Sequence, residues 1–301
     1  CVSLSRKAVD NEFLALSTRG LGVLSYLEGK HAEARTHYEN CLSIATESDD
    51  QRTIGLTLNS LGELARSIGD FSEARRYYER SLQSLQASGT LEAMAYPFCN
   101  LGMVAFAEGD ESASVSNLLK ALRLGTDFKS KANIASALDG FAAHSSRLGQ
   151  SRRAAILAGA AQAIRDSIGV VIEAADHQFR EKYLQEIRSA LLEADYLQCY
   201  QEGLKSSLDQ SVDLALQVVA DRTGAIESTG KPTSQNTDEP MLPVQFPISE
   251  QRAPKNVSST EYFLWGIKKY RYTTVGIALL VVALLGVTAY LVRTYWAYPN
   301  Q

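Results

Sequence analysis

Hydrophobic positions between residues 54 and 87 recur with the spacing of two consecutive amphipathic helices. In the first stretch, apolar side chains stand at 54, 58, 61, 64, 65 and 68, which places them on one stripe of a helix. Gly69-Asp70 then interrupts the pattern, because glycine suits the left-handed end of a helix and aspartate suits the start of the next one. A second stripe runs from Ser72 to Ala87. The pattern predicts a helical hairpin, and the small residues Gly62 and Ala74 would let its two backbones approach closely.

The same pattern recurs along the first half of the chain with a period of 40 residues. Leu-Gly pairs begin at Leu21, Leu61 and Leu101, and Phe141-Ala142 falls in the same register. Eight residues after each of these positions stands a glycine, and the four are Gly29, Gly69, Gly109 and Gly149. A spaced pattern that recurs at a fixed period is the signature of a repeat protein. The sequence therefore predicts an all-α solenoid of stacked hairpins over residues 1–165.

This pattern resembles the tetratricopeptide repeat (TPR), which has Leu-Gly, a glycine, an alanine, an aromatic and a small residue at matching offsets. The period of 40 exceeds the usual 34, which implies longer helices or loops. Pro97 falls early in a first helix and predicts that this helix starts late or kinks. Cys1–Ser5 align one period before Cys41–Ala45, so we expect a truncated first repeat, with the chain opening inside the end of a second helix.

Residues 166–220 keep a helical pattern but leave the repeat, and they predict a helical cap with a polar outer face, which a solenoid needs at its end. Together with residues 155–165, this segment resembles the end of the TPR arms of bacterial STAND-type ATPases and LuxR-type regulators. That resemblance implies a fold but transfers no functional residue. Residues 221–257 hold five of the seven prolines among Ser, Thr, Gln and Asn, and they predict a disordered linker.

Thr273 to Val292 is a run of twenty uncharged residues, long enough as a helix to cross the roughly 30 Å hydrocarbon core of a bilayer. The alternative is a buried core helix, but little sequence follows that could cover all its faces. Residues 258–272 carry aromatics and Lys268-Lys269, and they either lie in the headgroup region or extend the spanning helix. The basic residues lie mainly before the span, so the positive-inside rule predicts a single-pass protein with residues 1–271 in the cytoplasm and a short tail, 293–301, outside.

Charge and chemistry narrow the function classes further. The net charge of −4 combines −8 over residues 1–249 with +4 over residues 250–301, and this predicts no nucleic-acid partner. Four widely spaced cysteines without a CxxC motif argue against a zinc ribbon or a disulfide scaffold. Residues 224–233 lack the spacing and strand context of a phosphate loop. We therefore expect no catalytic residues, no metal and no cofactor.

If the repeats are TPR-like, the first helices line a concave groove that suits a peptide or protein segment. The alternative for any single groove position is that the side chain packs against the neighbouring helix. The function predicted is a non-enzymatic, membrane-anchored interaction scaffold. The family resemblance gives a second possibility, the sensing arm of a larger signalling NTPase or transcriptional regulator. The predicted groove residues are Arg19, Tyr26, Asn59, Glu63, Arg66, Tyr96, Phe106, Asp139 and Arg147.

Overall fold

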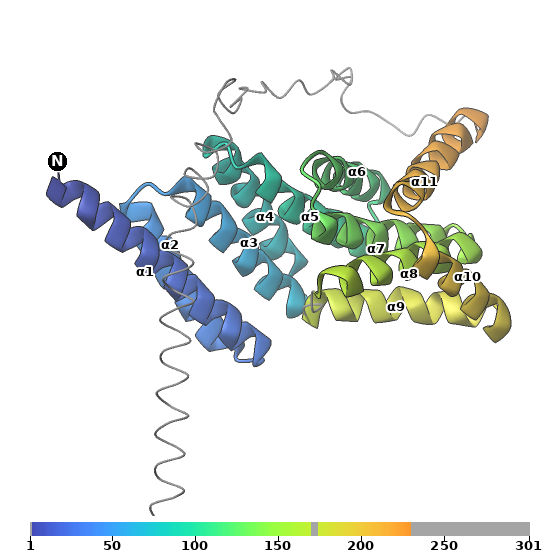
Figure 1. Cartoon of the computed structure of the whole chain (residues 1–301), viewed down its shortest axis with the longest axis horizontal. Helices are drawn as coiled ribbons and strands as arrows, with labels where there is room; N and C mark the ends of the chain where they lie inside the picture. The colour runs from blue at the N-terminus through green and yellow to red at the C-terminus, as the bar shows by residue number, and fades with distance from the viewer. Residues whose placement is uncertain (1, 170–173, 230–301) are drawn as a thin grey trace, which may run out of the picture. The chain divides into compact units, whose positions relative to one another are not determined.

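The computed structural model describes residues 2–169 and 174–229, and these residues form helices joined by short turns (Figure 1). Four hairpins come first, followed by three further helices. The hairpins are α1 (Val2–Leu27) with α2 (His31–Glu47), α3 (Gln51–Ser67) with α4 (Phe71–Ala87), α5 (Ala95–Glu108) with α6 (Glu111–Asp127), and α7 (Lys131–Arg147) with α8 (Ser151–Ile168). The later helices are α9 (Ala174–Ala190), α10 (Glu193–Lys205) and α11 (Leu208–Thr229).

The hairpin turns form as the sequence predicts. Each turn between the two helices of a hairpin contains a glycine with a positive φ, which only glycine adopts without strain. At the second hairpin, Asp70 precedes α4 and its carboxylate accepts a hydrogen bond of 2.9 Å from the backbone N–H of Glu73. This cap satisfies one of the free N–H groups at the helix start. The glycines and their φ angles are Gly29 (74°), Gly69 (85°), Gly109 (83°) and Gly149 (74°).

Stacking between hairpins follows the 40-residue period. The second helix of each hairpin packs against the first helix of the next, so that α2 meets α3, α4 meets α5 and α6 meets α7. Within a hairpin the close approach is made at Gly62, where an added Cβ would lie 2.7 Å from Cδ1 of the buried Tyr78 ring. The small residue therefore makes room for an aromatic ring of the facing helix. These contacts confirm the predicted solenoid of helical hairpins over the described residues.

Pro97 has the effect that its position predicted. In the third hairpin, a short 3-10 helix, η1 (Leu91–Met94), replaces the start of the first helix, and α5 begins at Ala95. Pro97 then stands in the first turn of α5, where a backbone N–H has no partner within the helix. The late start therefore removes the conflict between proline and the helix hydrogen bonds.

The start of the chain differs from the prediction of a truncated first repeat. α1 runs from Val2 to Leu27 without a break, so the described residues before Asn11 continue this helix and do not form the end of a separate one. One period later the break is made by Asp49, which takes a φ of 53°. The matching residue is Val9, and a β-branched side chain is poorly suited to that backbone conformation.

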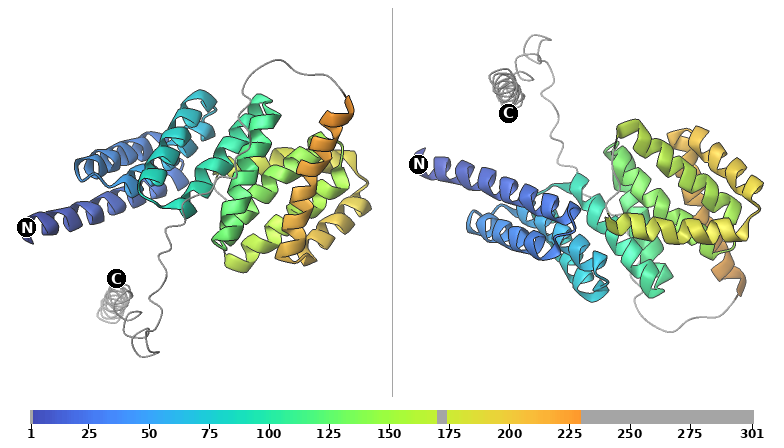
Figure 2. Two further views of the ribbon diagram at one scale, coloured as in Figure 1. Left: turned by 90° about the horizontal axis from the view of Figure 1, so that it is seen from above. Right: turned by 90° about the horizontal axis from the view of Figure 1, so that it is seen from below.

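The last helices pack against the hairpins in two different ways. α10 crosses α8 at two glycines: a Cβ on Gly159 would meet the carbonyl oxygen of Tyr200, and one on Gly203 would meet that of Ile156. α9 instead lies across α7 and α8 and reaches α3 (Figures 1 and 2). α11 packs on α6, α7 and α8 and continues to Thr229, past the predicted linker boundary at 220. The prolines begin only at 232, so the residues up to 229 remain compatible with a helix.

The chain divides into a compact unit, Cys1–Pro232, and a second unit, Thr233–Gln301. In the described part of the chain, no helix combines the length and the apolar composition that a bilayer span requires. The predicted spanning segment, residues 273–292, lies outside the described residues, as do residues 258–272, the tail 293–301 and the remainder of the linker.

Candidate functional site

The nine predicted groove residues lie on the first helices α1, α3, α5 and α7, and we call the side of these helices that carries them the inner face. The helix α9 packs against α3 and α7 on this side (Figure 2). Its Phe179 ring contacts the ring of Phe106 on α5. The chain's own helix therefore covers part of the surface where the sequence predicts a ligand.

A polar network ties the start of α9 to the inner face. The Arg66 guanidinium, with only 6% of its side chain exposed, forms an ion pair with Asp176 of α9 and lies 3.5 Å from Asn100 Oδ1. Asn100 Nδ2 donates in turn to Asn59 Oδ1 (3.2 Å) and to Glu63 Oε1 (3.3 Å), and Asn59 Nδ2 donates to Glu63 Oε1 at 2.9 Å. A buried cation needs such partners because it has lost its water. Arg66, Asn59 and Glu63 thus stabilise the packing of α3, α5 and α9.

A second buried cluster surrounds Asp139 and joins α7 to α8 and α9. Its carboxylate forms an ion pair with Arg165 of α8, accepts a hydrogen bond from the Tyr183 hydroxyl, and lies 3.8 Å from Nε of Arg180. Burial raises the pKa of Tyr183 well above its usual value, so its hydroxyl stays protonated and donates. Asp139 is 3% exposed, and its charge is balanced inside the protein. Its role is to hold the capping helices.

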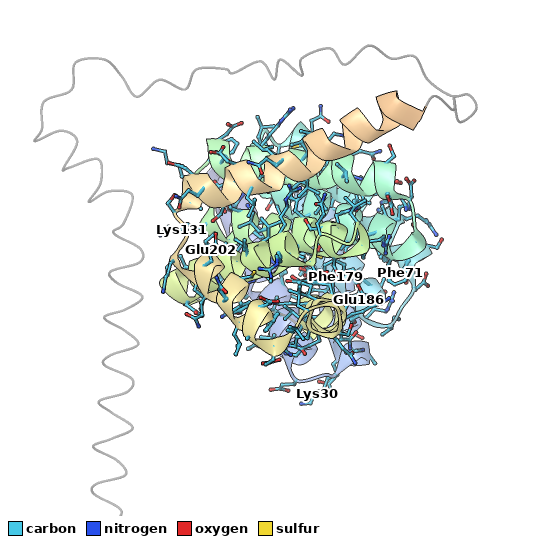
Figure 3. All side chains as sticks on the ribbon, turned by 90° about the vertical axis from the view of Figure 1, so that its right-hand side faces the viewer. Lys30, Phe71, Lys131, Phe179, Glu186 and Glu202 are labelled. Atoms are coloured by element: carbon cyan, nitrogen blue, oxygen red, sulfur yellow. The ribbon has the colours of Figure 1, made fainter. Side chains whose placement is uncertain are left out.

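Phe106 and Arg147 form the aromatic part of this interface. The Phe106 ring makes edge-to-face contacts with Phe179 (5.7 Å between centroids) and with His144 (4.9 Å); Phe179 is labelled on α9 in Figure 3. The Arg147 guanidinium carbon lies 3.5 Å from the Phe106 ring centroid, which is a cation–π contact. Arg147 also donates to the Phe106 carbonyl oxygen at 3.2 Å. Phe106 is therefore enclosed, whereas about a third of the Arg147 side chain stays exposed.

The buried predicted residues follow the alternative that groove positions pack against a neighbouring helix. Three of the predicted groove residues are aromatic and were expected to be accessible to a ligand, but Tyr26 and Phe106 are buried, and Tyr96 is 44% exposed. The physical reason is that α9 and the adjacent first helices fill the space beside these side chains. The predicted groove residues that are at most 8% exposed are Tyr26, Asn59, Arg66, Phe106 and Asp139.

The beginning of the inner face stays accessible. Leu16 of α1 is 36% exposed, Tyr96 of α5 holds the same register position two periods later and is 44% exposed, and Arg19 of α1 is partly exposed. Arg19 Nε is buried without a hydrogen-bond partner, which leaves one donor of a cation unsatisfied. We call Leu16, Arg19 and Tyr96 the open inner surface. It combines apolar area with a positive charge, a composition that suits a protein segment.

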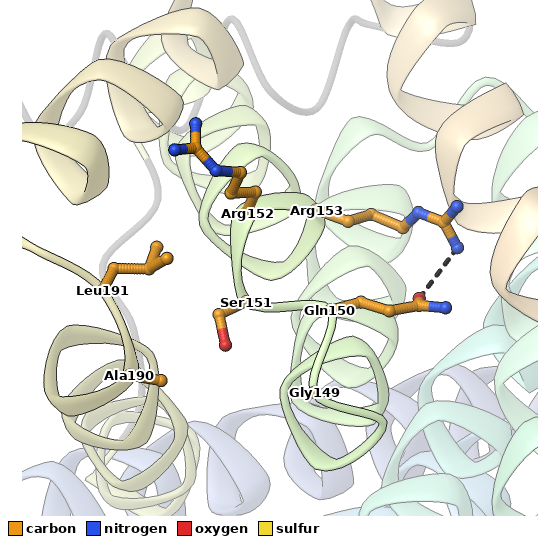
Figure 4. Close-up of a pocket in the computed structure, with 7 residues that line it drawn as sticks. All are labelled: Gly149, Gln150, Ser151, Arg152, Arg153, Ala190 and Leu191. Atoms are coloured by element: carbon orange, nitrogen blue, oxygen red, sulfur yellow. Dashed lines mark hydrogen bonds between the residues drawn. The ribbon is translucent and has the colours of Figure 1, made fainter.

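A pocket of about 430 Å³ lies at the start of α8, between Gly149 and Leu191 (Figure 4). Its two cations are engaged: Arg152 pairs with Asp195 at 2.9 Å, and Arg153 donates to Gln150 Oε1 at 2.8 Å. The residues that line it include no histidine, cysteine or carboxylate. It therefore lacks a nucleophile paired with a base.

Sequence reasoning missed a contact between a serine and a histidine on neighbouring helices. Ser114 Oγ lies 2.8 Å from His144 Nε2, but both residues are at most 2% exposed, and the serine hydroxyl donates to the Gly102 carbonyl oxygen at 2.6 Å. This pair packs α6 against α7 and has no access to a substrate. Burial also raises the pKa of the Cys41 and Cys99 thiols, which keeps them protonated. Across residues 2–169 and 174–229, no three His, Cys, Asp or Glu side chains gather into a possible metal site.

Comparison with known proteins adds one positive finding. Residues 13–87 match the tetratricopeptide repeat family, and they form the first two hairpins, from α1 to α4. No curated protein matches the chain. The match does not reach residues 155–216, so the resemblance to STAND-type and LuxR-type arms stays a prediction. The match and the stacked hairpins together support a tetratricopeptide repeat architecture, a fold that generally mediates protein–protein interaction.

Proposed function

We propose that this chain is a non-enzymatic interaction module that binds a protein or peptide segment on the open inner surface. The observation that carries the proposal is the tetratricopeptide match over residues 13–87, because the open inner surface lies mostly on helices within that match. α9 occupies the opposite part of the inner face. The proposed binding site thus lies on α1 and at the start of α5, where Leu16 and Tyr96 offer apolar area and the partly exposed Arg19 offers a positive charge.

Capture of partners by the full chain from detergent extracts tests this proposal. We expect Arg19→Glu combined with Tyr96→Ala to abolish capture of a partner that the wild-type chain binds. Arg80→Glu is the matched control, since Arg80 is exposed on α4, a second helix. Arg66→Glu is unsuitable because Arg66 is buried in its pair with Asp176. Equal capture by the inner-surface variant and the wild type would refute the proposed site.

The proposal includes a membrane anchor at residues 273–292, with residues 1–271 on the cytoplasmic side. It rests on the uncharged run of twenty residues and on the basic residues that precede it. The full chain should remain in the membrane pellet after carbonate extraction, whereas a chain ending at Pro232 should not. Protease added outside intact cells should leave residues 1–271 uncut. Cleavage within them would refute the orientation.

A second candidate role is the sensing arm of a larger signalling NTPase or transcriptional regulator. One observation favours it: the two segments that carry the resemblance, residues 155–169 and 202–216, meet at the crossing of Gly159 and Gly203. The resemblance therefore falls on residues that pack together and close the solenoid. If this role is right, the polypeptide that contains this chain should bind ATP. Failure of that whole polypeptide to bind ATP would refute the ATPase form of this role.

A further inference from the structure

Helix α1 carries a stripe of large apolar side chains that the described part of the chain does not cover. The spacing of these side chains places them along one side of the helix. Two of these side chains, Leu21 and Leu24, are 51% and 58% exposed, although the residues at the matching positions of the later repeats are buried. We call these residues the α1 stripe: Phe13 (73% exposed), Leu14 (52%), Leu21 (51%) and Leu24 (58%).

One period later, the residues that match Leu21 and Leu24 are completely enclosed. Leu61 and Leu64 of α3 are each 1% exposed, and they pack in one cluster with Ala34 and Tyr38 of α2. The second helix of the preceding hairpin therefore covers this part of α3. It does so with a small residue followed four positions later by a tyrosine.

The next two periods repeat the arrangement. Leu101 and Val104 of α5 cluster with Ala74 and Tyr78 of α4. Phe141 of α7 clusters with Leu118 of α6, and His144 of α7 contacts Ser114 at 2.8 Å. In three successive interfaces, the residues that match Leu21 and Leu24 in α3, α5 and α7 are covered by the second helix of the preceding hairpin. That helix presents a small residue and, one turn later, a large one.

We propose that the α1 stripe is a docking surface for the second helix of another tetratricopeptide-type hairpin, supplied by a partner that presents an alanine or serine and, four residues on, a tyrosine or leucine. The proposal continues the interface that α2, α4 and α6 already make inside the chain. It is independent of the proposed ligand on the open inner surface, because the α1 stripe uses positions that face the preceding hairpin.

The second helices α2, α4, α6 and α8 of another copy of this chain could not dock here unless part of that copy unfolded. The small-and-large pairs at Ala34/Tyr38, Ala74/Tyr78 and Ser114/Leu118 are already buried within the chain's own interfaces. In α8 the matching residues, Ala154 and Ala158, are also fully buried. Each of these faces is thus used internally, and the proposed occupant is a hairpin whose second helix still has this face uncovered.

A tethered hairpin tests the complementarity directly. In the full chain, residues 1–10 are replaced by a copy of residues 51–90, so that the copied Ala74 and Tyr78 precede α1 in the register that they hold before α5. Tethering gives the added helix a high effective concentration at the stripe. We expect hydrogen exchange of the α1 amides to slow more than tenfold, since the added helix must leave before α1 can open.

The matched control carries Leu21→Glu and Leu24→Glu in α1. These side chains are exposed, so the unfused control should keep the helicity of the wild type by circular dichroism, while the fused control should lose the protection of α1. Unchanged exchange in the fused chain, whether or not the added hairpin is folded, would overturn the proposal. So would an unfused chain that sediments as a dimer and becomes a monomer with these two substitutions, since the stripe would then bind a second copy.

Discussion

The close contact between Gly62 and Tyr78 gives a prediction whose size can be worked out from the structure. In Gly62→Ala the new Cβ would lie 2.7 Å from Cδ1 and 2.9 Å from Cζ of the Tyr78 ring. The ring is fully buried among Ala65, Ala74 and Leu101, so it has little room to move. Overpacking of this kind costs about 1–3 kcal/mol, and alanine returns at most about 1 kcal/mol of helix propensity. The free energy of unfolding should fall by about 1–2 kcal/mol.

Gly20→Ala is the matched control, because Gly20 also lies inside a helix but an added Cβ there would meet nothing within 4 Å. This variant should gain about 0.5–1 kcal/mol from helix propensity alone. Both are measured by urea unfolding of the full chain, followed by far-ultraviolet circular dichroism. If Gly62→Ala proves as stable as Gly20→Ala, the close approach of α3 and α4 is not as described.

Three further predictions concern the later helices and the buried tyrosines. Gly203→Ala should lower the free energy of unfolding by about 3 kcal/mol, because the new Cβ meets the Ile156 backbone, which cannot rotate away. If urea unfolding shows a loss no larger than that of Gly62→Ala, α8 and α10 do not cross as closely as described. Arg66→Met should speed hydrogen exchange in the first turns of α9 but spare its later turns, which the Asp139 cluster holds; uniform exchange along α9 would contradict this. Burial raises the pKa of Tyr78 and Tyr183, so the folded state holds these protons more tightly than the unfolded chain. The stability that this provides is complete below the tyrosine pKa of the unfolded chain, about 10, and above it is lost by about 1.4 kcal/mol per pH unit for each tyrosine. Tyr78→Phe should therefore reduce the slope of the free energy of unfolding against pH, measured by urea unfolding between pH 9 and 11.

Local sequence signals accounted for the hairpins. The turn at Gly69-Asp70 was predictable because a positive φ and a side-chain cap are properties of single residues. The late start of α5 followed from Pro97 for the same reason. The continuous α1 was missed because the alignment of Cys1–Ser5 with Cys41–Ala45 says nothing of the turn between helices. That turn depends on Asp49, and the matching residue is Val9.

The position of α9 could not be predicted from local pattern. Arg66 and Asp176 are 110 residues apart in the sequence, and neither belongs to a spacing that links them. The repeat resemblance placed Arg66 and Asp139 on the inner face, which is their location, but it could not show that α9 covers them. Burial of Tyr26, Asn59 and Arg66 in the first two hairpins was likewise not predicted, because it depends on contacts between helices that are distant in the sequence.

Photo-crosslinking in native membranes tests most directly whether the open inner surface binds the partner. A photoreactive phenylalanine analogue is placed at Leu16, at Tyr96, or at the control position Arg80 on α4, in the full chain. The account predicts a shared protein adduct from Leu16 and Tyr96 that is absent from Arg80. Adducts of equal yield from all three positions, or an adduct from Arg80 alone, would contradict it.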